Sequence, residues 1–324
     1  MLDYEQAELV QPSGHAVPDG LQGRLSLYFL DRPGGDHGPA QRLRVALAMP
    51  ARDEARGTIL FSPGRTEFIE KYLESIDDLT RRGFCVVIVD PRGQGLSERM
   101  LDDRVRSYVA TFQDYADDLG WVCDTLAPHC PKPVVAMGHS MGGTIVLHAI
   151  LSGVLSPSAV ITSAPMLGLL DIDNEFMRAA IRGLSALGLS RRNLPFQKQR
   201  GGLPVAFADN KLTSDRERYK RWASFFQNSP RLRVGEPTFG WIAAALSSMA
   251  FVNRNAARLG IPGLMVAAGG DQIVDPAAVE RFAQRAGSEY RVVPGAKHEL
   301  FLERDPMRDE FFDIIDRFLE DQAL

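Results

Sequence analysis

The chain contains little cysteine and no long apolar run. It has three cysteines in 324 residues, an odd number that cannot all pair, and Cys123 and Cys130 lack the spacing of metal ligands. No run of about 18 or more apolar residues occurs, so no transmembrane helix is predicted. The start of the chain, Met1 to Glu5, lacks the basic and then apolar layout of a secretory signal. These absences lead us to expect a cytoplasmic protein with free thiols.

The segment around Ser140 fits the pattern G-x-S-x-G, with Gly138 and Gly142 as its glycines. A short β-branched apolar run at 134–137 precedes it, and an apolar run of helical length at 144–151 follows it. Strand, sharp turn and helix are the context that makes this pattern a nucleophile elbow. Such a turn leaves room only for tiny side chains two positions either side of the nucleophile. The pattern therefore predicts Ser140 as an exposed nucleophile.

A serine nucleophile needs a base and an orienting acid, which this architecture supplies in the chain order Ser, Asp or Glu, His. Residues 263–268 read as a strand, and Asp271 follows its end. Residues 290–293 read as another strand, and His298 follows that one. Open parallel sheets place their ligands at the carboxyl ends of the strands. Order and position therefore predict a triad of Ser140, His298 and Asp271.

Five further histidines are weaker candidates for the base: His15, His37, His129, His139 and His148. The first three lie in loops or in segments rich in glycine and proline. His139 adjoins the serine, so its side chain is expected to point away from the elbow. His148 lies in the following helix, where packing or capping is its expected role.

Asp275 is the main rival of Asp271 for the acid. It precedes Pro276 and resembles the N-cap of a helix over 277–286 with proline at its first position. That role accounts for Asp275 and favours Asp271 as the catalytic acid. Glu299, next to the candidate base, is interpreted as a carboxylate that stabilises its loop rather than as a member of the triad.

The reaction also needs two donors for the oxyanion that forms on the substrate. One is expected to be the backbone N–H of Met141, directly after the nucleophile. The second is expected from the loop 62–67 after a strand at 58–61, where Gly64 permits close backbone approach and Arg65 offers its N–H. The Arg65 side chain either meets a charged substrate or is only solvated, and the sequence leaves both open.

Several segments resemble those of known enzymes. Residues 63–72 are similar to the oxyanion loop of monoacylglycerol lipases and bacterial lysophospholipases, and residues 90–97 are similar to their Asp-x-Arg-Gly-x-Gly-x-Ser loop. The likeness spans roughly residues 24–320 and is strongest to the lysophospholipase L2 family of Gram-negative bacteria. It continues through residues 112–119, 163–166, 212–219, 233–241 and 295–299.

This resemblance implies the α/β-hydrolase fold and a lysophospholipid or monoacylglycerol as substrate, and it extends to the serine aminopeptidase-like hydrolases. One departure is that the oxyanion loop opens with Ser62-Pro63-Gly64, where the lipases have His-Gly. We expect the change to be harmless because the donor is a backbone group. No metal, no organic cofactor and no nucleic-acid partner are implied.

Predicted strands and helices divide the chain into three parts. Residues 1–165, with a tail at about 1–22, form the first part of the hydrolase core, and residues 257–324 form the second. The second part ends in an amphipathic helix over 307–319. Residues 166–256 lack a clear strand and are predicted to form a helical lid above the nucleophile. The fold class is therefore α/β, a mostly parallel central sheet wrapped by helices with an inserted lid.

The predicted lid is basic, whereas the rest of the chain is acidic. It contains 14 Lys and Arg against 7 Asp and Glu, and because the whole chain has a net charge of −4, the remainder carries −11. This distribution indicates either attraction to phosphate or an anionic membrane surface, or bystander charge on solvated helices. An apolar stripe at helical spacing could line an acyl pocket or touch lipid, but core packing is favoured. The stripe consists of Phe176, Ala180, Ile181, Leu184 and Leu187.

The sequence thus predicts a serine ester hydrolase, foremost a lysophospholipase or monoacylglycerol lipase, with peripheral contact at the inner face of the membrane as a further expectation. Ser140 is acylated with His298 as its base, Asp271 orients the imidazolium, and the N–H groups of Arg65 and Met141 hold the oxyanion.

Three alternatives stay open: a small-ester carboxylesterase, a serine aminopeptidase and a catalytically silent ligand receptor of the same fold. The basic lid counts against an aminopeptidase, which must bind a cationic amino terminus. The retention of all three triad candidates counts against a receptor. The oligomeric state is left open.

Overall fold

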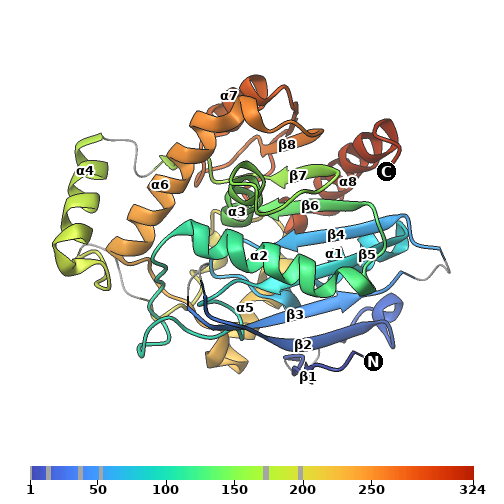
Figure 1. Cartoon of the computed structure of the whole chain (residues 1–324), viewed down its shortest axis with the longest axis horizontal. Coiled ribbons are helices and arrows are strands. Elements are labelled where there is room, and N and C mark those ends of the chain that lie inside the picture. The colour runs from blue at the N-terminus through green and yellow to red at the C-terminus, as the bar shows by residue number, and fades with distance from the viewer. Residues whose placement is uncertain (1, 12–15, 36–38, 51–53, 171–174, 196–199) are drawn as a thin grey trace.

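The computed structural model describes residues 2–11, 16–35, 39–50, 54–170, 175–195 and 200–324. In these ranges nine strands form one sheet at the centre of the molecule, with helices on both faces (Figure 1). The strands are β1 Glu5–Gln6, β2 Leu25–Arg32, β3 Gln41–Ala48, β4 Gly57–Ser62, β5 Phe84–Asp90, β6 Val134–His139, β7 Ala159–Ser163, β8 Gly263–Ala268 and β9 Glu289–Val293.

The described residues form eight α-helices: α1 Leu73–Arg81, α2 Phe112–Leu126, α3 Met141–Leu151, α4 Glu175–Leu184, α5 Arg216–Asn228, α6 Phe239–Asn255, α7 Pro276–Ala286 and α8 Asp305–Asp321. The helix that the sequence predicts over 277–286 is α7. It begins as expected, because Asp275 accepts a hydrogen bond from the N–H of Ala277. It ends where Gly287 takes up a left-handed backbone conformation with φ of 64°.

The segment after the loop 62–67 turns into helix in two steps. Residues Ile69–Tyr72 make a 3-10 turn, and regular helix begins only with α1. Phe68 has extended backbone, and the N–H of Ile69 donates to the carboxylate of Asp90 at 2.9 Å. A contact between distant residues, rather than local helix propensity, therefore sets where this segment turns.

Six neighbouring strands of the sheet are parallel. The spatial order is β1-β2-β3-β5-β4-β6-β7-β8-β9, and the pairs from β5 to β9 are all parallel. β2 and β3 form an antiparallel hairpin, and β3 joins β5 antiparallel. Because parallel strands end at one edge, the loops after β4, β6, β8 and β9 gather there. The predicted α/β class with a mostly parallel sheet is confirmed.

The first strand lies within the segment that the sequence analysis treats as a tail. β1 pairs antiparallel with β2, where Glu5 lies opposite Phe29 and Gln6 opposite Tyr28. A strand of two residues carries no periodic pattern, so the sequence gives no sign of it. The tail therefore adds an edge strand to the sheet.

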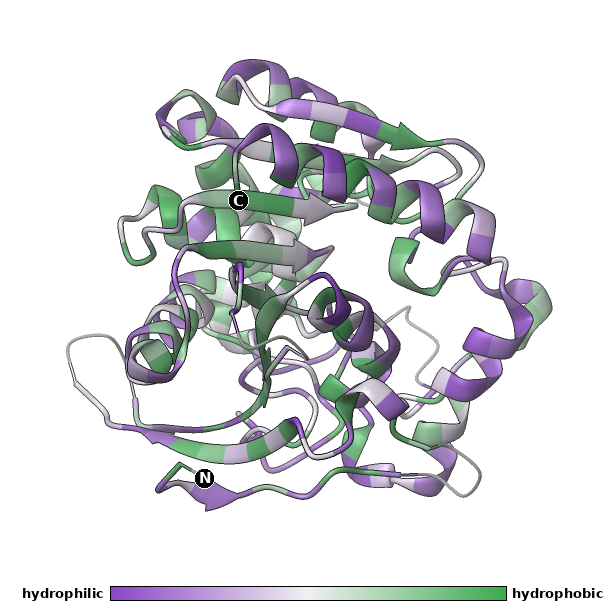
Figure 2. Cartoon of the chain, turned by 90° about the vertical axis from the view of Figure 1, so that its right-hand side faces the viewer, coloured by the Kyte–Doolittle hydropathy of each residue, from purple (hydrophilic) through white to green (hydrophobic). Residues whose placement is uncertain are grey.

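The sheet separates two apolar layers. Alternate residues of each strand face opposite layers, as the pleat requires. On β4, Leu60 packs in the layer of α2, α3 and α7, while Ile59 and Phe61 pack in the layer of α1 and α8. Figure 2 shows strands of the sheet in green between helices that carry purple residues. Because both faces are covered, the parallel strands read in the sequence as nearly continuous apolar runs.

Residues 166–256, which we call the cap segment, contain α4, α5 and α6 and no strand in their described part. α6 packs against α2 and α3 of the core, and α4 packs against α6 (Figure 1). α5 contributes Phe225 and Phe226, which contact Phe68 of the core. Among the described residues, no helix is both long and apolar enough to span a membrane.

The apolar stripe of α4 does not form a core, and the preference for core packing is wrong. Ile181 is buried, with 3% of its surface exposed, but Phe176 and Leu187 are 82% and 81% exposed. Ala180 and Leu184 are exposed as well. The reason is that α4 lies at the edge of the molecule, where it packs on α6 and leaves its other side uncovered by the described chain (Figure 1).

Candidate active site

The backbone turns sharply at Ser140, between the end of β6 and the start of α3. Ser140 has φ of 52° and ψ of −116°, a strained conformation for a residue with a side chain. A Cβ on Gly138 would lie 2.4 Å from the carbonyl oxygen of Gly142, and a Cβ on Gly142 would lie 1.9 Å from that of Ser62. The turn therefore requires glycine at both positions.

Three side chains from three strand ends meet at this turn. Ser140 Oγ lies 2.9 Å from His298 Nε2, and His298 Nδ1 lies 2.7 Å from Asp271 Oδ2. With the ring hydrogen assigned to Nδ1, His298 donates to Asp271 and accepts from Ser140, as in a catalytic triad. Asp271 is itself held, because its Oδ1 accepts hydrogen bonds from the N–H groups of Ile273 and Val274.

The two main rivals for these roles lie elsewhere. Asp275 caps α7 and pairs with Arg281 at 3.1 Å. The ring nitrogens of His148 contact Ser248 Oγ at 2.8 Å and Gln113 Oε1 at 3.1 Å. Burial lowers the pKa of His148 to about 4, so its imidazole is neutral at pH 7. Both side chains are thus accounted for by structural contacts.

The two expected oxyanion donors border the space above the nucleophile. Arg65 and Met141 line the same cavity as Ser140. Within the described part of the chain, the backbone N–H of neither residue has an intramolecular acceptor. Two unengaged donors beside a nucleophile are what an oxyanion hole requires.

The loop around Arg65 is held on both sides of that donor. The N–H of Gly64 donates to the carboxylate of Glu67, and the N–H of Thr66 donates to the side-chain oxygen of Gln94. The sequence analysis did not assign a role to Gln94, although it lies in the loop that resembles those of the lipases. Its hydrogen bond fixes Thr66. The free N–H of Arg65 therefore lies between two residues, Gly64 and Thr66, whose own N–H groups are hydrogen-bonded.

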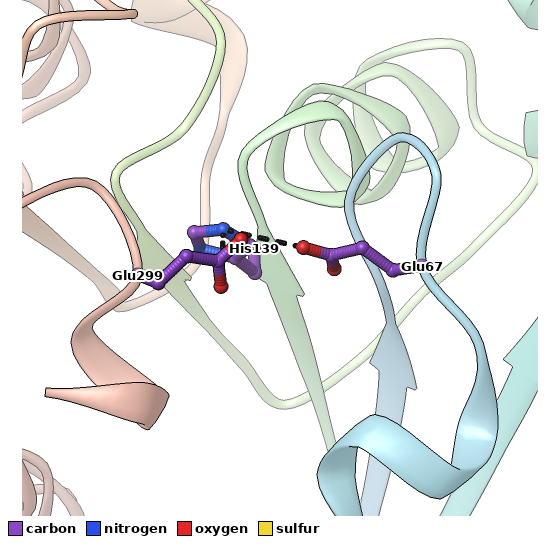
Figure 3. Close-up of side chains that lie close together, drawn as sticks. All are labelled: Glu67, His139 and Glu299. Carbon is purple, nitrogen blue, oxygen red and sulfur yellow. Dashed lines mark ion pairs between the residues drawn. The ribbon is translucent and has the colours of Figure 1, made fainter. Parts of the chain in front are cut away.

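Close to His298 lies a buried group of charged side chains, which we call the floor cluster: Glu67, Lys71, His139 and Glu299. Figure 3 shows three of its members, Glu67, His139 and Glu299, and the ion-pair contacts between them. Lys71 Nζ lies 2.7 Å from Glu299 Oε1 and also pairs with Glu67. His139 Nε2 lies 3.2 Å from Glu299 Oε2, close enough for an ion pair although the angles fall short of a hydrogen bond. The imidazole rings of His139 and His298 lie 4.9 Å apart between centroids.

The floor cluster refines two expectations. His139 does turn away from the nucleophile, but its ring lies close to that of the candidate base, and its Nδ1 contacts the carbonyl oxygen of Ser163 at 3.1 Å. Glu299 does stabilise its loop, through Lys71. Sequence reasoning missed Glu67 and Lys71 as its partners. The sequence did contain a signal for them. Glu67 and Lys71, the basic residue before Tyr72, lie in the segment 63–72 that resembles the lipase oxyanion loop.

The floor cluster shares protons near neutral pH. Burial raises the pKa of Glu67 to about 7, with Glu299 adding to the rise and Lys71 opposing it. Burial alone would raise the pKa of Glu299, but His139 and Lys71 hold it well below its usual range. Burial opposes a charge on His139, yet Glu299 and Glu67 raise its pKa. The proton that titrates therefore belongs to the cluster as a whole.

Three members of the floor cluster have the side chains of a metal site. One atom each from Glu67, His139 and Glu299 lies within 4.8 Å of the others. However, the ammonium group of Lys71 pairs with both carboxylates. It supplies the positive charge that a cation would bring, so the residues present fit a lysine ion pair rather than a metal ion.

A cavity of about 470 Å³ borders Ser140 and His298. Its walls are mostly apolar and come from both the core and the cap segment. They include Met166, Met177, Ile181, Leu194, Trp241 and Ile273. A second cavity of about 450 Å³ adjoins it, and the two share lining from Arg65, Thr66, Leu212 and Trp222. We call these the acyl cavity and the outer cavity.

A family model described as serine aminopeptidase S33 matches residues 53–305. The chain belongs to this family. It is 32% identical to lysophospholipase L2 of Escherichia coli K12 over 271 residues, which cover 77% of this chain and 76% of that protein. It is 24% identical to a monoacylglycerol lipase of Mycolicibacterium smegmatis, over 77% of this chain and 84% of that one.

A solved structure agrees with the family in fold. A soluble variant of monoglyceride lipase from Saccharomyces cerevisiae superposes with a TM-score of 0.71 at 20% identity, over 98% of this chain and 99% of that one. The resemblance to lysophospholipases and monoacylglycerol lipases is therefore confirmed. As a member of this family with the α/β-hydrolase fold, the protein is an ester hydrolase.

Proposed function

We propose that this hydrolase cleaves the carboxylic ester of a lysophospholipid through an acyl-enzyme on Ser140. The observation that carries the proposal is the chain of contacts from Ser140 to His298 to Asp271 beside a mostly apolar cavity. Such a cavity suits a single acyl chain, since burial of apolar surface favours binding. Lysophospholipids and monoacylglycerols both carry one acyl chain, and relatives named for both substrates match this chain.

The proposed reaction has two halves. His298 Nε2 takes the proton of Ser140 as its oxygen attacks the ester carbonyl, and the N–H groups of Arg65 and Met141 stabilise the oxyanion. The imidazolium of His298, stabilised by Asp271, then protonates the departing glycerol oxygen. In the second half His298 removes a proton from water, which attacks the acyl-enzyme. The fatty acid leaves, and the proton returns to Ser140.

The cap segment acts as the lid in this proposal, with the boundaries 166–256. Its residues Met177 and Ile181 on α4 and Trp241 on α6 line the acyl cavity, so a substrate chain lies between the cap segment and the core. Movement of α4 relative to α6 would open this space, because α4 lies at the edge of the molecule and packs on α6 (Figure 1).

The outer side of α4 is proposed to contact an anionic membrane surface. Phe176 is exposed on α4, Leu187 is exposed in the π-helical turn Ser185–Leu189 that follows it, and Arg191 and Arg192 are exposed just beyond that turn. Apolar side chains flanked by arginine are the composition that binds an interface peripherally. Lys198, a further candidate for this surface, lies outside the described residues.

A vesicle assay tests this contact. Neutralising Arg191 and Arg192 to glutamine should weaken recruitment to vesicles that contain phosphatidylglycerol, and added salt should do the same in the parent, because exposed charges are screened. Turnover of a soluble short ester should not change. Unchanged recruitment in the double variant at low salt would remove the membrane part of the proposal and leave the esterase part intact.

The alternatives fit the site less well. An aminopeptidase needs a carboxylate beside the nucleophile that is free to bind the amino terminus. Within the described chain, the carboxylates that share the acyl cavity with Ser140 are Glu67 and Glu299, and both are paired with Lys71. A small-ester esterase does not need a cavity of about 470 Å³. A silent receptor does not need a hydrogen-bonded triad.

A substrate panel tests the proposed function. The parent should hydrolyse 1-palmitoyl lysophosphatidylethanolamine and 1-palmitoylglycerol faster than p-nitrophenyl acetate at equal concentration, and it should not cleave an aminoacyl p-nitroanilide. The matched control is Ser140→Ala, which should lose about 10⁶-fold in turnover, as other serine hydrolases do without their nucleophile. Preferred cleavage of the anilide would favour the aminopeptidase, and no turnover on any substrate would favour the receptor.

A further inference from the structure

The side chain of Arg65 is half-buried and lines two cavities of the protein. It borders both the acyl cavity and the outer cavity. Its Nη1 donates a hydrogen bond to the carbonyl oxygen of Gly235 at 2.7 Å, and its guanidinium lies 5.5 Å from the ring centroid of Trp241. The sequence leaves open whether this side chain meets a substrate or is only solvated. Its place between the two cavities favours contact with a substrate.

Arg65 has no carboxylate partner within ion-pair distance in the described chain. Glu236 is the carboxylate that acts on it electrostatically, but this carboxylate accepts a hydrogen bond from the N–H of Arg200 at 2.8 Å. Burial lowers the pKa of Arg65, although the group stays charged at pH 7. Buried charges in proteins are normally paired, because an unpaired one is costly.

Other buried arginines of this protein follow that rule. Arg44 pairs with Glu70 and with Asp90, and Arg92 pairs with Asp118 at 2.6 Å. Both have completely buried side chains. The contrast indicates that the counter-ion of Arg65 is not part of the protein but enters the cavity.

Arg99 is a second buried arginine without a carboxylate partner in the described chain. Its guanidinium donates to the carbonyl oxygens of Gly95 and Arg231, and it borders neither the acyl cavity nor the outer cavity. An unpaired arginine alone is therefore not a binding site in this protein. What distinguishes Arg65 is its position beside the nucleophile and the cavities.

The position of Arg65 also fits the layout of the substrate. Its own backbone N–H is the proposed oxyanion donor, so its guanidinium lies about one side chain away from the ester carbonyl. In a lysophospholipid the phosphate lies a glycerol unit away from that carbonyl. The acyl cavity borders Ser140 and has room for the chain, and the outer cavity, which shares Arg65 and Thr66 with it, is left for the head group.

The walls of the outer cavity are more polar than those of the acyl cavity. Arg200 and Lys211 add positive charge, and Asp209 and Glu236 add negative charge. The cations suit a phosphate, and the two carboxylates suit the ammonium group of a zwitterionic head group. The carboxylates of the acyl cavity, Glu67 and Glu299, differ in that both are paired with Lys71.

We propose that the guanidinium of Arg65 binds the phosphate of the substrate head group, and that the outer cavity is the head-group subsite. Arg65 is then a specificity-determining residue that favours a lysophospholipid over a monoacylglycerol. This inference rests on the proposed function, since it names the part of the substrate that the same site would recognise. A guanidinium suits the task because it presents several N–H donors to phosphate oxygens at once.

The test compares two substrates within each variant. The measured quantity is kcat/KM for 1-palmitoyl lysophosphatidylethanolamine divided by kcat/KM for 1-palmitoylglycerol, which share an acyl chain and differ in the phosphate. Arg65→Met keeps the backbone N–H and should lower this ratio about 10- to 100-fold, as expected for the loss of a hydrogen bond to a charged group. Arg65→Lys should lower it less, because it keeps the charge but not the planar fork.

The ratio separates recognition from damage to the oxyanion loop. Misplacement of the backbone donor would reduce both activities equally and leave the ratio unchanged. Arg99→Met is the matched control, another buried arginine without a carboxylate partner, and its ratio should equal that of the parent. An unchanged ratio in Arg65→Met, with the parent active on both substrates, would overturn the inference and leave the proposed function standing. A parent inactive on both would instead overturn the proposed function.

A second arm distinguishes a head group from free phosphate. Glycerol 3-phosphate should inhibit hydrolysis of 1-palmitoylglycerol by the parent more strongly than inorganic phosphate does, and Arg65→Met should lose most of this inhibition. Equal inhibition by the two anions would identify a free-phosphate site and overturn the head-group assignment. Inhibition by glycerol 3-phosphate that persists undiminished in Arg65→Met would place the anion elsewhere and overturn the inference.

Discussion

The floor cluster and the cap segment border the same reacting atoms, yet their charges and apolar groups are arranged in opposite ways. Close to His298, Glu67, Lys71, His139 and Glu299 are buried, and each lies within ion-pair distance of an opposite charge. Above Ser140, the cap segment contributes apolar walls, and its helix α4 leaves large apolar side chains exposed.

The difference separates two tasks. The floor cluster connects the oxyanion loop, through Glu67 and Gly64, to the loop of the base, through Glu299. Paired buried charges hold one arrangement, because removing one partner leaves the other uncompensated. The cap segment meets the variable part of the substrate, and apolar contacts without fixed directions tolerate such variation. In the proposed function, the floor cluster would therefore hold the catalytic loops in place, and the cap segment would influence the choice of substrate.

After loss of the nucleophile itself, the largest effect on turnover is expected at Asp271, which contacts the candidate base His298. Asp271→Asn should lower turnover by about 10⁴-fold, because the amide holds His298 in the wrong tautomer. Steady-state kinetics with a soluble short ester measure this loss. The control, Asp275→Asn, should leave turnover nearly unchanged and reduce the free energy of unfolding by at most about 1 kcal/mol through a weaker cap of α7. If the losses of turnover were reversed, Asp275 would be the catalytic acid.

Lys71→Met removes the ammonium from between two buried carboxylates. We expect a loss of about 3–5 kcal/mol in the free energy of unfolding, typical of a buried ion pair with one partner deleted. Denaturant unfolding measures it. The control Lys220→Met breaks an exposed pair with Glu217 and should cost less than about 1 kcal/mol. Similar small losses in both variants would show that the floor cluster does not stabilise the fold.

The shared proton of the floor cluster makes stability depend on pH. The pKa of Glu67 is 4.5 when the chain is unfolded and about 7 in the fold, so the folded protein holds a proton that the unfolded chain releases. This stabilisation is complete below pH 4.5 and is lost as the pH rises through 7. It should fall by at most about 1.4 kcal/mol per pH unit. The raised pKa of His139 acts in the same direction at higher pH.

Glu67→Gln isolates this contribution. The free energy of unfolding of the variant should decline less steeply than that of the parent between pH 4.5 and 7, the interval between the two pKa values of Glu67. Urea unfolding at several pH values measures both slopes. Parallel slopes would mean that Glu67 does not titrate in this interval and that the floor cluster keeps its charges throughout.

The smallest effect is expected on α4, where two apolar residues face opposite ways. Ile181 lines the acyl cavity, so Ile181→Ser should raise KM for a long-chain ester about 10-fold, the equivalent of losing one buried apolar side chain. Phe176→Ser should leave KM for the same ester in detergent solution unchanged, because that ring is exposed. Equal changes in KM for the two variants would mean that α4 moves as a whole and that neither side has a distinct role.

The triad could be predicted from the sequence because its signals are local. Each residue follows a short apolar run, and the rule that parallel strands end at one edge brings Ser140, Asp271 and His298 together. The elbow glycines are local in the same way. The fold class follows from the alternation of strands and helices. This alternation is easy to recognise in the sequence because the connecting loops are short.

The floor cluster could not be predicted, because its members lie far apart along the chain. Glu67, His139 and Glu299 meet only after the sheet has ordered β4, β6 and β9. The prediction that the apolar stripe packs in the core was wrong for another reason. Periodicity shows that a helix has an apolar side but not whether another layer covers it, and Phe176 is 82% exposed.

Covalent labelling shows whether Ser140 is the residue that becomes acylated. The parent and Ser140→Ala are incubated with a fluorophosphonate probe, and the labelled peptide is identified by mass spectrometry. If Ser140 is the nucleophile, the parent should carry one adduct on Ser140 and the variant should carry none. Circular dichroism should show that both proteins are equally folded. An adduct that persists in Ser140→Ala, or that maps to another residue of the parent, would contradict this assignment of the nucleophile.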